Sequence, residues 1–320
     1  MAPGDADPRG NARRHTRPGE RTDVTLKPLI TTLMLSLCLA ACGGGSSTGA
    51  PSSGLDAQDL HYVAMGDSYS SGHGTEPKPD MAQCSRTEYS YAKLWADRHG
   101  VRDFTFVACQ GATTANVLTQ AQTDQSETRP QLEALSPRTN MVTITIGGND
   151  TGFADIARAC AESEINNRDT PACMQRILGV QQIVDGAVLL PDNTTFSSHL
   201  LRTYQAIRQK LSPDARIYVL GYPQIYYLPP GDNAIGPATR QMVDGLMISM
   251  NREIRTAAET AGVTYVDVDR YFAGHGAGAA NPNAQWINDI DFRDIHVSLH
   301  PNIAGHAQGD LPALEAATGG

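Results

Sequence analysis

Four short segments, far apart in the sequence, carry residues that together could hydrolyse an ester. Ser68 stands in the tripeptide Gly-Asp-Ser, and Gly111 follows Cys-Gln at the next segment. Asn149 follows two glycines, and His300 precedes a proline and an asparagine. Ester hydrolysis through a serine needs a nucleophile, a base and donors aimed at the oxyanion that forms. Ser68 and His300 could supply the first two. The N–H groups of Ser68 and Gly111, with the Asn149 amide, could supply the third.

Each of these residues also has a purely structural explanation. Gly-Asp-Ser is a common turn sequence, and Gly111 could simply turn the chain after a strand. Asn149 or, by preference, Asp150 could cap a helix over residues 151–161. His300 could be a structural histidine before a helix that begins with proline, since proline suits the first helical position. The position of the four segments relative to the expected strands decides between these interpretations.

Strands alternate with helices along the chain. Apolar, β-branched runs predict strands at residues 61–65, 104–108, 140–146, 216–220 and 263–268. Helical patterns are expected at residues 88–98, through most of 155–211 with breaks at Pro171 and 191–193, at 241–261 and at 302–314. This alternation predicts an α/β fold with a mostly parallel sheet covered on both faces.

The candidate residues cluster after these strands. Ser68 and Asn149 lie directly beyond two of them, and Gly111 lies shortly beyond a third. The carboxyl ends of parallel strands share one edge of a sheet, where sites collect. We therefore expect the three residues to lie at one site.

The four segments occur in the order of the sequence blocks of the GDSL, or SGNH, hydrolase family. The chain resembles that family over most of residues 60–310. The resemblance implies a flavodoxin-like, three-layer α/β/α sandwich and hydrolysis of esters of lipids, small acyl donors or acetylated sugars. It implies that Ser68 is the nucleophile and His300 the base. Ser68, Gly111 and Asn149 would form the oxyanion hole, and no cofactor is implied.

The chain departs from the family pattern near the histidine. The family usually has an aspartate three residues before it, which orients the imidazole, and Val297 occupies that position here. The backbone carbonyl of Val297 could accept from Nδ1, as in relatives that work with a Ser-His dyad. Alternatively Asp294, or less favourably Asp291, could reach the ring. We favour the carbonyl, which fixes the tautomer but stabilises imidazolium less than a carboxylate would.

Four cysteines remain beyond the N-terminal region: Cys84, Cys109, Cys160 and Cys173. In an exported protein an even number suggests disulfides, and four cysteines allow three pairings. We favour the local pairing of Cys84 with Cys109 and Cys160 with Cys173, because it closes short loops. A zinc site is the alternative, but no CxxC pair or clustered His supports one. In the secreted actinobacterial lipases that the chain resembles, a bridge like Cys84–Cys109 lies beside the Gly111 segment.

The N-terminal region predicts export. An apolar run at residues 29–41 is too short to cross a bilayer as a helix, suits a signal peptide, and ends at Cys42 in a sequence that resembles the bacterial lipobox. We expect a lipoprotein signal at 1–41, lipidation of Cys42, a flexible linker at 42–57 and a hydrolase domain at 58–320. A plain secretory signal cleaved near Ala41 is the alternative.

The net charge limits the classes of partner that the protein is expected to bind. Removing residues 1–41 takes away six basic and four acidic residues, so the net charge changes from −9 to −11. Such an acidic body argues against nucleic acid as a partner, and against electrostatic adhesion to anionic lipid. A covalent lipid would have to hold the protein at a membrane.

These features predict a lipid-anchored, or secreted, extracytoplasmic serine ester hydrolase that acts through an acyl-enzyme, without metal or cofactor. Segments 155–211 and 222–230 could form an acyl pocket. A polysaccharide O-acetylesterase and a non-catalytic binding lipoprotein are the alternatives. The sequence does not specify the acyl chain, the alcohol or the oligomeric state.

Overall fold

A five-stranded parallel sheet lies at the centre of the structure, a computed structural model that describes residues 59–75, 84–156, 159–160, 169–228, 236–291 and 295–319. The strand order is β2-β1-β3-β4-β5, with parallel pairing throughout. The strands are β1 (His61–Gly66), β2 (Asp103–Phe106), β3 (Met141–Thr145), β4 (Arg216–Leu220) and β5 (Thr264–Val266). All five fall where the sequence predicts strands.

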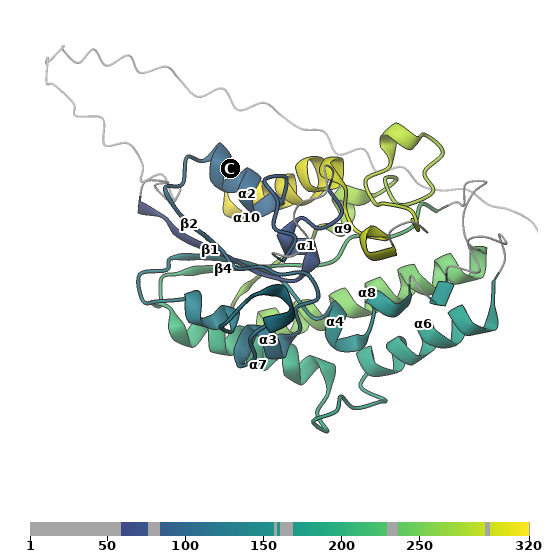
Figure 1. Cartoon of the computed structure of the whole chain (residues 1–320), viewed down its shortest axis with the longest axis horizontal. Helices are drawn as coiled ribbons and strands as arrows, with labels where there is room; N and C mark the ends of the chain where they lie inside the picture. The colour runs from purple at the N-terminus through teal and green to yellow at the C-terminus, as the bar shows by residue number, and fades with distance from the viewer. Residues whose placement is uncertain are drawn as a thin grey trace, which may run out of the picture. The chain divides into compact units, whose positions relative to one another are not determined.

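Helices cover both faces of the sheet (Figure 1). One layer contains α2 (Tyr91–Arg98) and α10 (Leu311–Thr318), with the short α1 (Ser68–Ser71) and α9 (Asp269–Phe272) on the same side. The other layer contains α3 (Thr114–Leu118), α4 (Gly148–Thr151), α6 (Pro171–Val184), α7 (Phe196–Lys210) and α8 (Pro237–Thr260). The predicted three-layer α/β/α sandwich is confirmed.

Short helical turns complete the described elements. Four are 3₁₀ helices: Thr123–Gln125, Gln131–Ala134, Pro282–Ala284 and Ile295–Val297. A π-helical turn, Gly305–Asp310, runs directly into α10. The helix predicted at residues 302–314 is present, but it is π-helical over Gly305–Asp310. A Cβ on Gly309 would lie 2.3 Å from the Phe272 ring, so glycine permits the close packing of this wide turn on α9.

Local sequence fixes the ends of the long helices. Thr170 and Thr195 accept hydrogen bonds from the first turns of α6 and α7, as N-caps do. A proline occupies the first position of α6, and another begins α8. The break expected near residues 191–193 separates α6 from α7.

The turn after β1 docks α1 onto the end of β3. Gly66 has a φ of +120°, and a Cβ there would lie 2.3 Å from the Thr145 carbonyl oxygen, so only glycine fits. The Asp67 N–H donates to that carbonyl at 2.9 Å, and the Thr145 N–H donates to the Ser70 hydroxyl at 2.9 Å. Ser68 thus begins its helix at the carboxyl edge of the sheet.

Both favoured disulfides are present. Cys84 is bonded to Cys109 and Cys160 to Cys173. The first bridge is reinforced by the Gln110 N–H, which donates to the Cys84 carbonyl at 3.1 Å. It therefore anchors the segment that leads into Gly111.

Candidate active site

The hydroxyl of Ser68 and the imidazole of His300 meet at the carboxyl edge of the sheet. Ser68 Oγ lies 2.8 Å from His300 Nε2, although 232 positions separate the two residues. Ser68 comes from the first turn of α1, and His300 from the loop that precedes the π-helical turn. This distance is within hydrogen-bonding reach for proton transfer from the hydroxyl to the ring.

A backbone carbonyl lies against the imidazole, as predicted, but the nearest carbonyl is that of Ser298, one residue after Val297. His300 Nδ1 lies 2.9 Å from the carbonyl oxygen of Ser298, whereas the Val297 carbonyl accepts from the His300 backbone N–H at 3.4 Å. Leu299 explains the difference: its φ of +62° turns the chain so that the Ser298 carbonyl faces the ring. With Nδ1–H donating to this carbonyl, Nε2 is left as the acceptor toward Ser68.

The two candidate carboxylates differ in what the structure describes of them. Asp294 lies outside the described residues. The backbone N–H of Asp291 donates to the Ser298 hydroxyl at 2.9 Å, so this residue helps to shape the loop.

The surroundings of His300 keep it neutral. Removal of the ring from water lowers the pKa of His300 well below its ordinary value of 6.5, and His73 lowers it further. The Ser298 carbonyl, and after it the Val297 carbonyl, act in the opposite direction and raise this pKa. A neutral imidazole is the form that can accept the serine proton.

Two neighbours of the ring were not singled out from the sequence. The Tyr69 ring lies 5.0 Å from that of His300, and its hydroxyl donates to the Leu299 carbonyl at 2.5 Å. His73 stands edge-on to His300 at 4.8 Å, while its Nε2 lies 2.8 Å from the His296 carbonyl oxygen. Their position within five residues of Ser68 was the available signal.

The predicted oxyanion donors lie beside the pair. Ser68, Gly111, Asn149 and His300 all line one hollow. One N–H of the Asn149 amide donates to the Ala112 carbonyl at 2.9 Å, which leaves the second free to point elsewhere. Within the described residues, the backbone N–H groups of Ser68 and Gly111 have no acceptor.

A buried carboxyl and a tyrosine connect the Ser68 and Asn149 segments. Tyr222 Oη donates to Asp67 Oδ2 at 2.5 Å and accepts from the Gly148 N–H at 2.8 Å. Asp67 also caps α1 by accepting from the Tyr69 N–H at 2.9 Å. Burial raises the pKa of Asp67 to about 7, against the lowering effect of the Tyr222 bond. Tyr222 lies two residues beyond β4, at the same sheet edge, which could have indicated it.

Asp150 does not cap the helix predicted after it. The helix α4 begins at Gly148, and the Asp150 carboxylate instead accepts from the backbone N–H of Thr114, at 3.1 and 3.0 Å. Thr114 is the first residue of α3. The carboxylate therefore links two elements rather than ending one.

Two hollows meet at Ser68 and His300. A narrow one of about 100 Å³ is bordered by apolar side chains, among them Tyr69, Phe153 and Leu299. The other, of about 680 Å³, has mostly polar described borders, which include the side chains of Gln110, Asn116, Gln122 and Gln125. An acyl chain and a polar alcohol would suit different hollows.

This geometry, on this fold, is that of a serine ester hydrolase. The GDSL-like lipase/acylhydrolase family model matches residues 64–308, and the chain belongs to that family. Lipase 1 of Streptomyces coelicolor is 33% identical over 292 residues, which cover 90% of this chain and 96% of the relative.

Two crystal structures are also similar. The extracellular lipase of Streptomyces rimosus has a TM-score of 0.67 and 32% identity, over 81% of this chain and 99% of the other. The phospholipase A1 of Streptomyces albidoflavus has a TM-score of 0.67 and 32% identity, over 80% and 98%. The protein is accordingly a carboxylic-ester hydrolase. Within the described residues, no helix combines the length and apolarity that a bilayer span requires.

Proposed function

We propose that Ser68 and His300 form a catalytic dyad that hydrolyses carboxylic esters through an acyl-enzyme. The observation that carries the proposal is the 2.8 Å distance between Ser68 Oγ and Nε2 of His300. His300 takes the serine proton as Oγ attacks the acyl carbonyl, and it returns this proton to the leaving alcohol. Water, activated by the same ring, then attacks the acyl-enzyme and releases the acid.

The oxyanion is held by three donors in this proposal. They are the backbone N–H groups of Ser68 and Gly111 and the remaining N–H of the Asn149 amide. Their common position around one hollow supports the assignment. Loss of one such donor typically reduces kcat by about 10²- to 10³-fold.

The Ser298 carbonyl replaces a triad aspartate in this account. It fixes the tautomer of His300 without adding a negative charge. Hydrolysis of p-nitrophenyl butyrate tests the dyad: Ser68→Ala and His300→Ala should each lose at least about 10⁴-fold in kcat. Asp294→Asn should keep most of the activity. An Asp294→Asn loss as large as that of His300→Ala would restore a carboxylate to the mechanism.

For the substrate, we propose esters of lipids or small acyl chains with a polar alcohol. The apolar borders of the narrow hollow suit the acyl chain, and the polar hollow suits the alcohol. Among the described residues of the expected 222–230 segment, Tyr222 borders the narrow hollow. The relatives described as a lipase and a phospholipase A1 support a lipid substrate.

Polysaccharide O-acetyl esters are the second candidate, favoured by the small volume of the narrow hollow. A cavity of about 150 Å³ binds benzene, so about 100 Å³ accommodates only a few carbon atoms. Against this candidate, no Tyr, Trp or Phe is found among the described residues that line the polar hollow. A p-nitrophenyl ester series from C2 to C16 separates the candidates: a maximum at C2 with acetylated oligosaccharide as a better substrate favours deacetylation, and activity extending to long chains favours lipid.

We also propose that the enzyme acts outside the cytoplasm, anchored through a lipid on Cys42. Residues 1–41, Cys42 and the linker 42–57 lie outside the described residues, so the support is the sequence pattern itself. Radiolabelled palmitate should be incorporated by the wild type and not by Cys42→Ser. A mature N-terminus that lacks lipid and starts elsewhere would favour plain secretion instead.

A further inference from the structure

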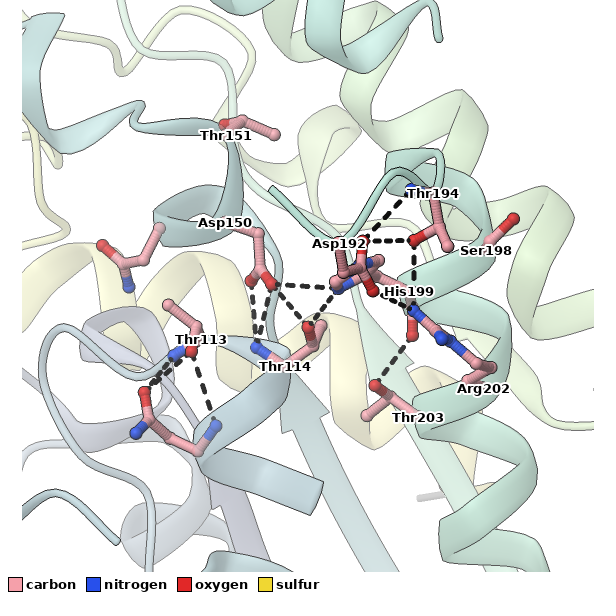
Figure 2. Close-up of polar contacts among 12 residues, drawn as sticks. Thr113, Thr114, Asp150, Thr151, Asp192, Thr194, Ser198, His199, Arg202 and Thr203 are labelled. Carbon is pink, nitrogen blue, oxygen red and sulfur yellow. Dashed lines mark hydrogen bonds and ion pairs between the residues drawn. The ribbon is translucent and has the colours of Figure 1, made fainter. Parts of the chain in front are cut away.

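A chain of polar contacts links Asp192, His199, Thr114 and Asp150 (Figure 2). It begins at Asp192, in the turn between α6 and α7, whose carboxylate oxygens lie 3.0 Å from His199 Nε2 and 3.1 Å from Arg202 Nη2. His199 Nδ1 lies 3.0 Å from the Thr114 hydroxyl. That hydroxyl in turn donates to the Asp150 carboxylate.

The chain is progressively more buried toward its inner end. The Asp192 side chain is 44% exposed, that of His199 17% and that of Asp150 5%. Thr114 is fully buried. A buried hydrogen-bond network of this kind holds its members in one arrangement, because breaking any bond leaves a buried polar group unpaired.

The ring of His199 bridges the two halves of the chain. The Thr114 hydroxyl has one hydrogen, which it donates to Asp150, and its oxygen remains an acceptor toward His199 Nδ1. On the other side of the ring, the Asp192 carboxylate can accept from Nε2. The ring thus lies 3.8 Å from Asp150 on one side and beside Asp192 on the other.

The charges around the ring come from three places. Asp150 is on α4, Asp192 is in the turn before α7, and Arg202 is on α7 itself, one turn from His199. Burial raises the pKa of Asp150, while its bonds to Thr114 and the His199 charge lower it. Bonds to His199, first, and to Thr194 hold the pKa of Asp192 below its ordinary value. Two carboxyl groups thus face the ring of His199.

The inner end of the chain adjoins both loops of the oxyanion hole. Thr114 is three residues beyond Gly111, and Asp150 directly follows Asn149. Hydrogen bonds join the two loops: Asn149 Nδ2 donates to the Ala112 carbonyl, and the Thr114 N–H and hydroxyl donate to Asp150. A shift of Thr114 relative to Asp150 would therefore change the separation of the donors on Gly111 and Asn149.

We propose that His199 is a positioning residue, which through Thr114 and Asp150 holds the Gly111 and Asn149 donors at the separation that the oxyanion requires. The proposal rests on the proposed function of those donors. Because the donors bind the transition state more strongly than the ester, the network affects kcat and leaves KM nearly unchanged.

Two matched pairs of variants test the proposal. Thr114→Val removes the hydroxyl but keeps the side-chain shape and the N–H bond to Asp150, and Thr114→Ser retains the hydroxyl. In His199→Asn, the side-chain amide nitrogen is three bonds from Cα, as Nδ1 is in histidine, so its N–H can face Thr114. In His199→Gln, the amide nitrogen is four bonds from Cα, as Nε2 is in histidine, so its N–H can face Asp192. The Asn variant keeps the inner bond, and the Gln variant keeps the outer one.

We expect Thr114→Val and His199→Gln to lower kcat for p-nitrophenyl butyrate about tenfold, with KM changed less than twofold. This loss is smaller than that for removal of an oxyanion donor, since the donor is misplaced and not removed. Thr114→Ser and His199→Asn should recover most of the loss. Affinity for a boronic-acid transition-state analogue should fall in parallel with kcat. Arg252→Ala, which removes an exposed ion pair to Asp185 at 3.4 Å, is the control for loss of surface charge.

The outcomes distinguish a failure of the positioning role of His199 from a failure of the Ser68–His300 dyad. If Ser68→Ala abolishes hydrolysis but Thr114→Val retains wild-type kcat per titrated active site, the positioning role is wrong and the dyad stands. If the melting temperature falls while kcat per active site does not, the network is only structural, which also overturns the role. Equal losses of kcat in His199→Asn and His199→Gln would show that the contact of residue 199 with Thr114 is not the one that matters for catalysis. Wild-type activity in Ser68→Ala would instead refute the proposed function.

Discussion

The Tyr69 hydroxyl donates to the Leu299 carbonyl at 2.5 Å and so joins the residue after the nucleophile to the residue before the base. Leu299 has a φ of +62°, a conformation that costs a side-chain-bearing residue about 1–2 kcal/mol. It is held from the other side by its own N–H, which donates to the Asn288 carbonyl at 3.0 Å. Contacts on both sides keep the strained residue in place, and with it the ring of His300.

Replacing Tyr69 by phenylalanine should therefore loosen the histidine loop. We expect Tyr69→Phe to lower kcat about tenfold and the free energy of unfolding by about 1 kcal/mol, the typical contribution of one hydrogen bond. Steady-state kinetics and urea denaturation measure the two effects. Tyr204→Phe is the matched control, because the buried Tyr204 hydroxyl has no partner among the described residues. Unchanged kcat in Tyr69→Phe would show that the loop holds His300 without this bond.

The pH dependence should reflect the lowered pKa of His300. A base whose pKa is lowered stays unprotonated, and hence active, to lower pH than an ordinary histidine. The acid limb of kcat/KM should accordingly have its midpoint clearly below pH 6.5. His73→Gln removes a neighbour that lowers this pKa, so its midpoint should shift upward. A wild-type midpoint at or above 6.5 would contradict the neutral, desolvated base.

Asp67 should make the protein less stable as the pH rises. Its pKa is about 7 in the folded protein and 3.8 when unperturbed, so between these values the folded state binds more protons than the unfolded state. Its contribution is fully present below pH 3.8 and is lost as the pH rises through 7. At 1.36 kcal/mol per pKa unit the loss is roughly 4 kcal/mol.

Asp67→Asn isolates this effect, since asparagine resembles the protonated carboxyl and does not titrate. The unfolding free energy of Asp67→Asn relative to wild type should rise between pH 4 and pH 8, as measured by urea denaturation at each pH. Other buried carboxyls titrate in both proteins, so their effects cancel in the difference. A difference that does not vary with pH would show that Asp67 is ionised throughout.

The two disulfides should differ in their effect on catalysis. Removing either one as a double serine variant should lower the unfolding free energy by about 3 kcal/mol, because the sequence separations are 25 and 13 residues. Only loss of Cys84–Cys109 should also lower kcat, since that bridge anchors the Gly111 loop. Equal kcat in the two variants would show that the Cys84–Cys109 bridge does not affect the oxyanion hole.

The sequence predicted the parts of the site that depend on local backbone chemistry. A short β-prone run before Gly66 identified β1, and a β-branched run before Gly147 identified β3, and with them the edge at which Ser68 and Asn149 lie. Gly66 is an example: with a φ of +120° and no room for a Cβ, the turn after β1 requires glycine, which is also the first residue of the Gly-Asp-Ser motif. Alternation of strands and helices then fixed the layers.

What the sequence missed depends on contacts between distant segments. The Ser298 carbonyl replaced that of Val297 because Leu299 adopts a left-handed conformation, which nothing in a leucine indicates. Asp150 was expected to cap its own helix, and it binds Thr114, 36 residues earlier, instead. His199 reaches the same network from α7, 85 residues from Thr114, with no local pattern to reveal it.

The most direct test of the account is the site of covalent labelling by a fluorophosphonate, read by mass spectrometry of the digested protein. An activated serine displaces the fluoride and keeps the phosphonyl group, so the adduct reports nucleophile and base together. We expect one adduct, on Ser68, and none in His300→Ala at the same exposure, although that variant retains the hydroxyl. An adduct on another residue, or labelling of His300→Ala at the wild-type rate, would contradict the dyad.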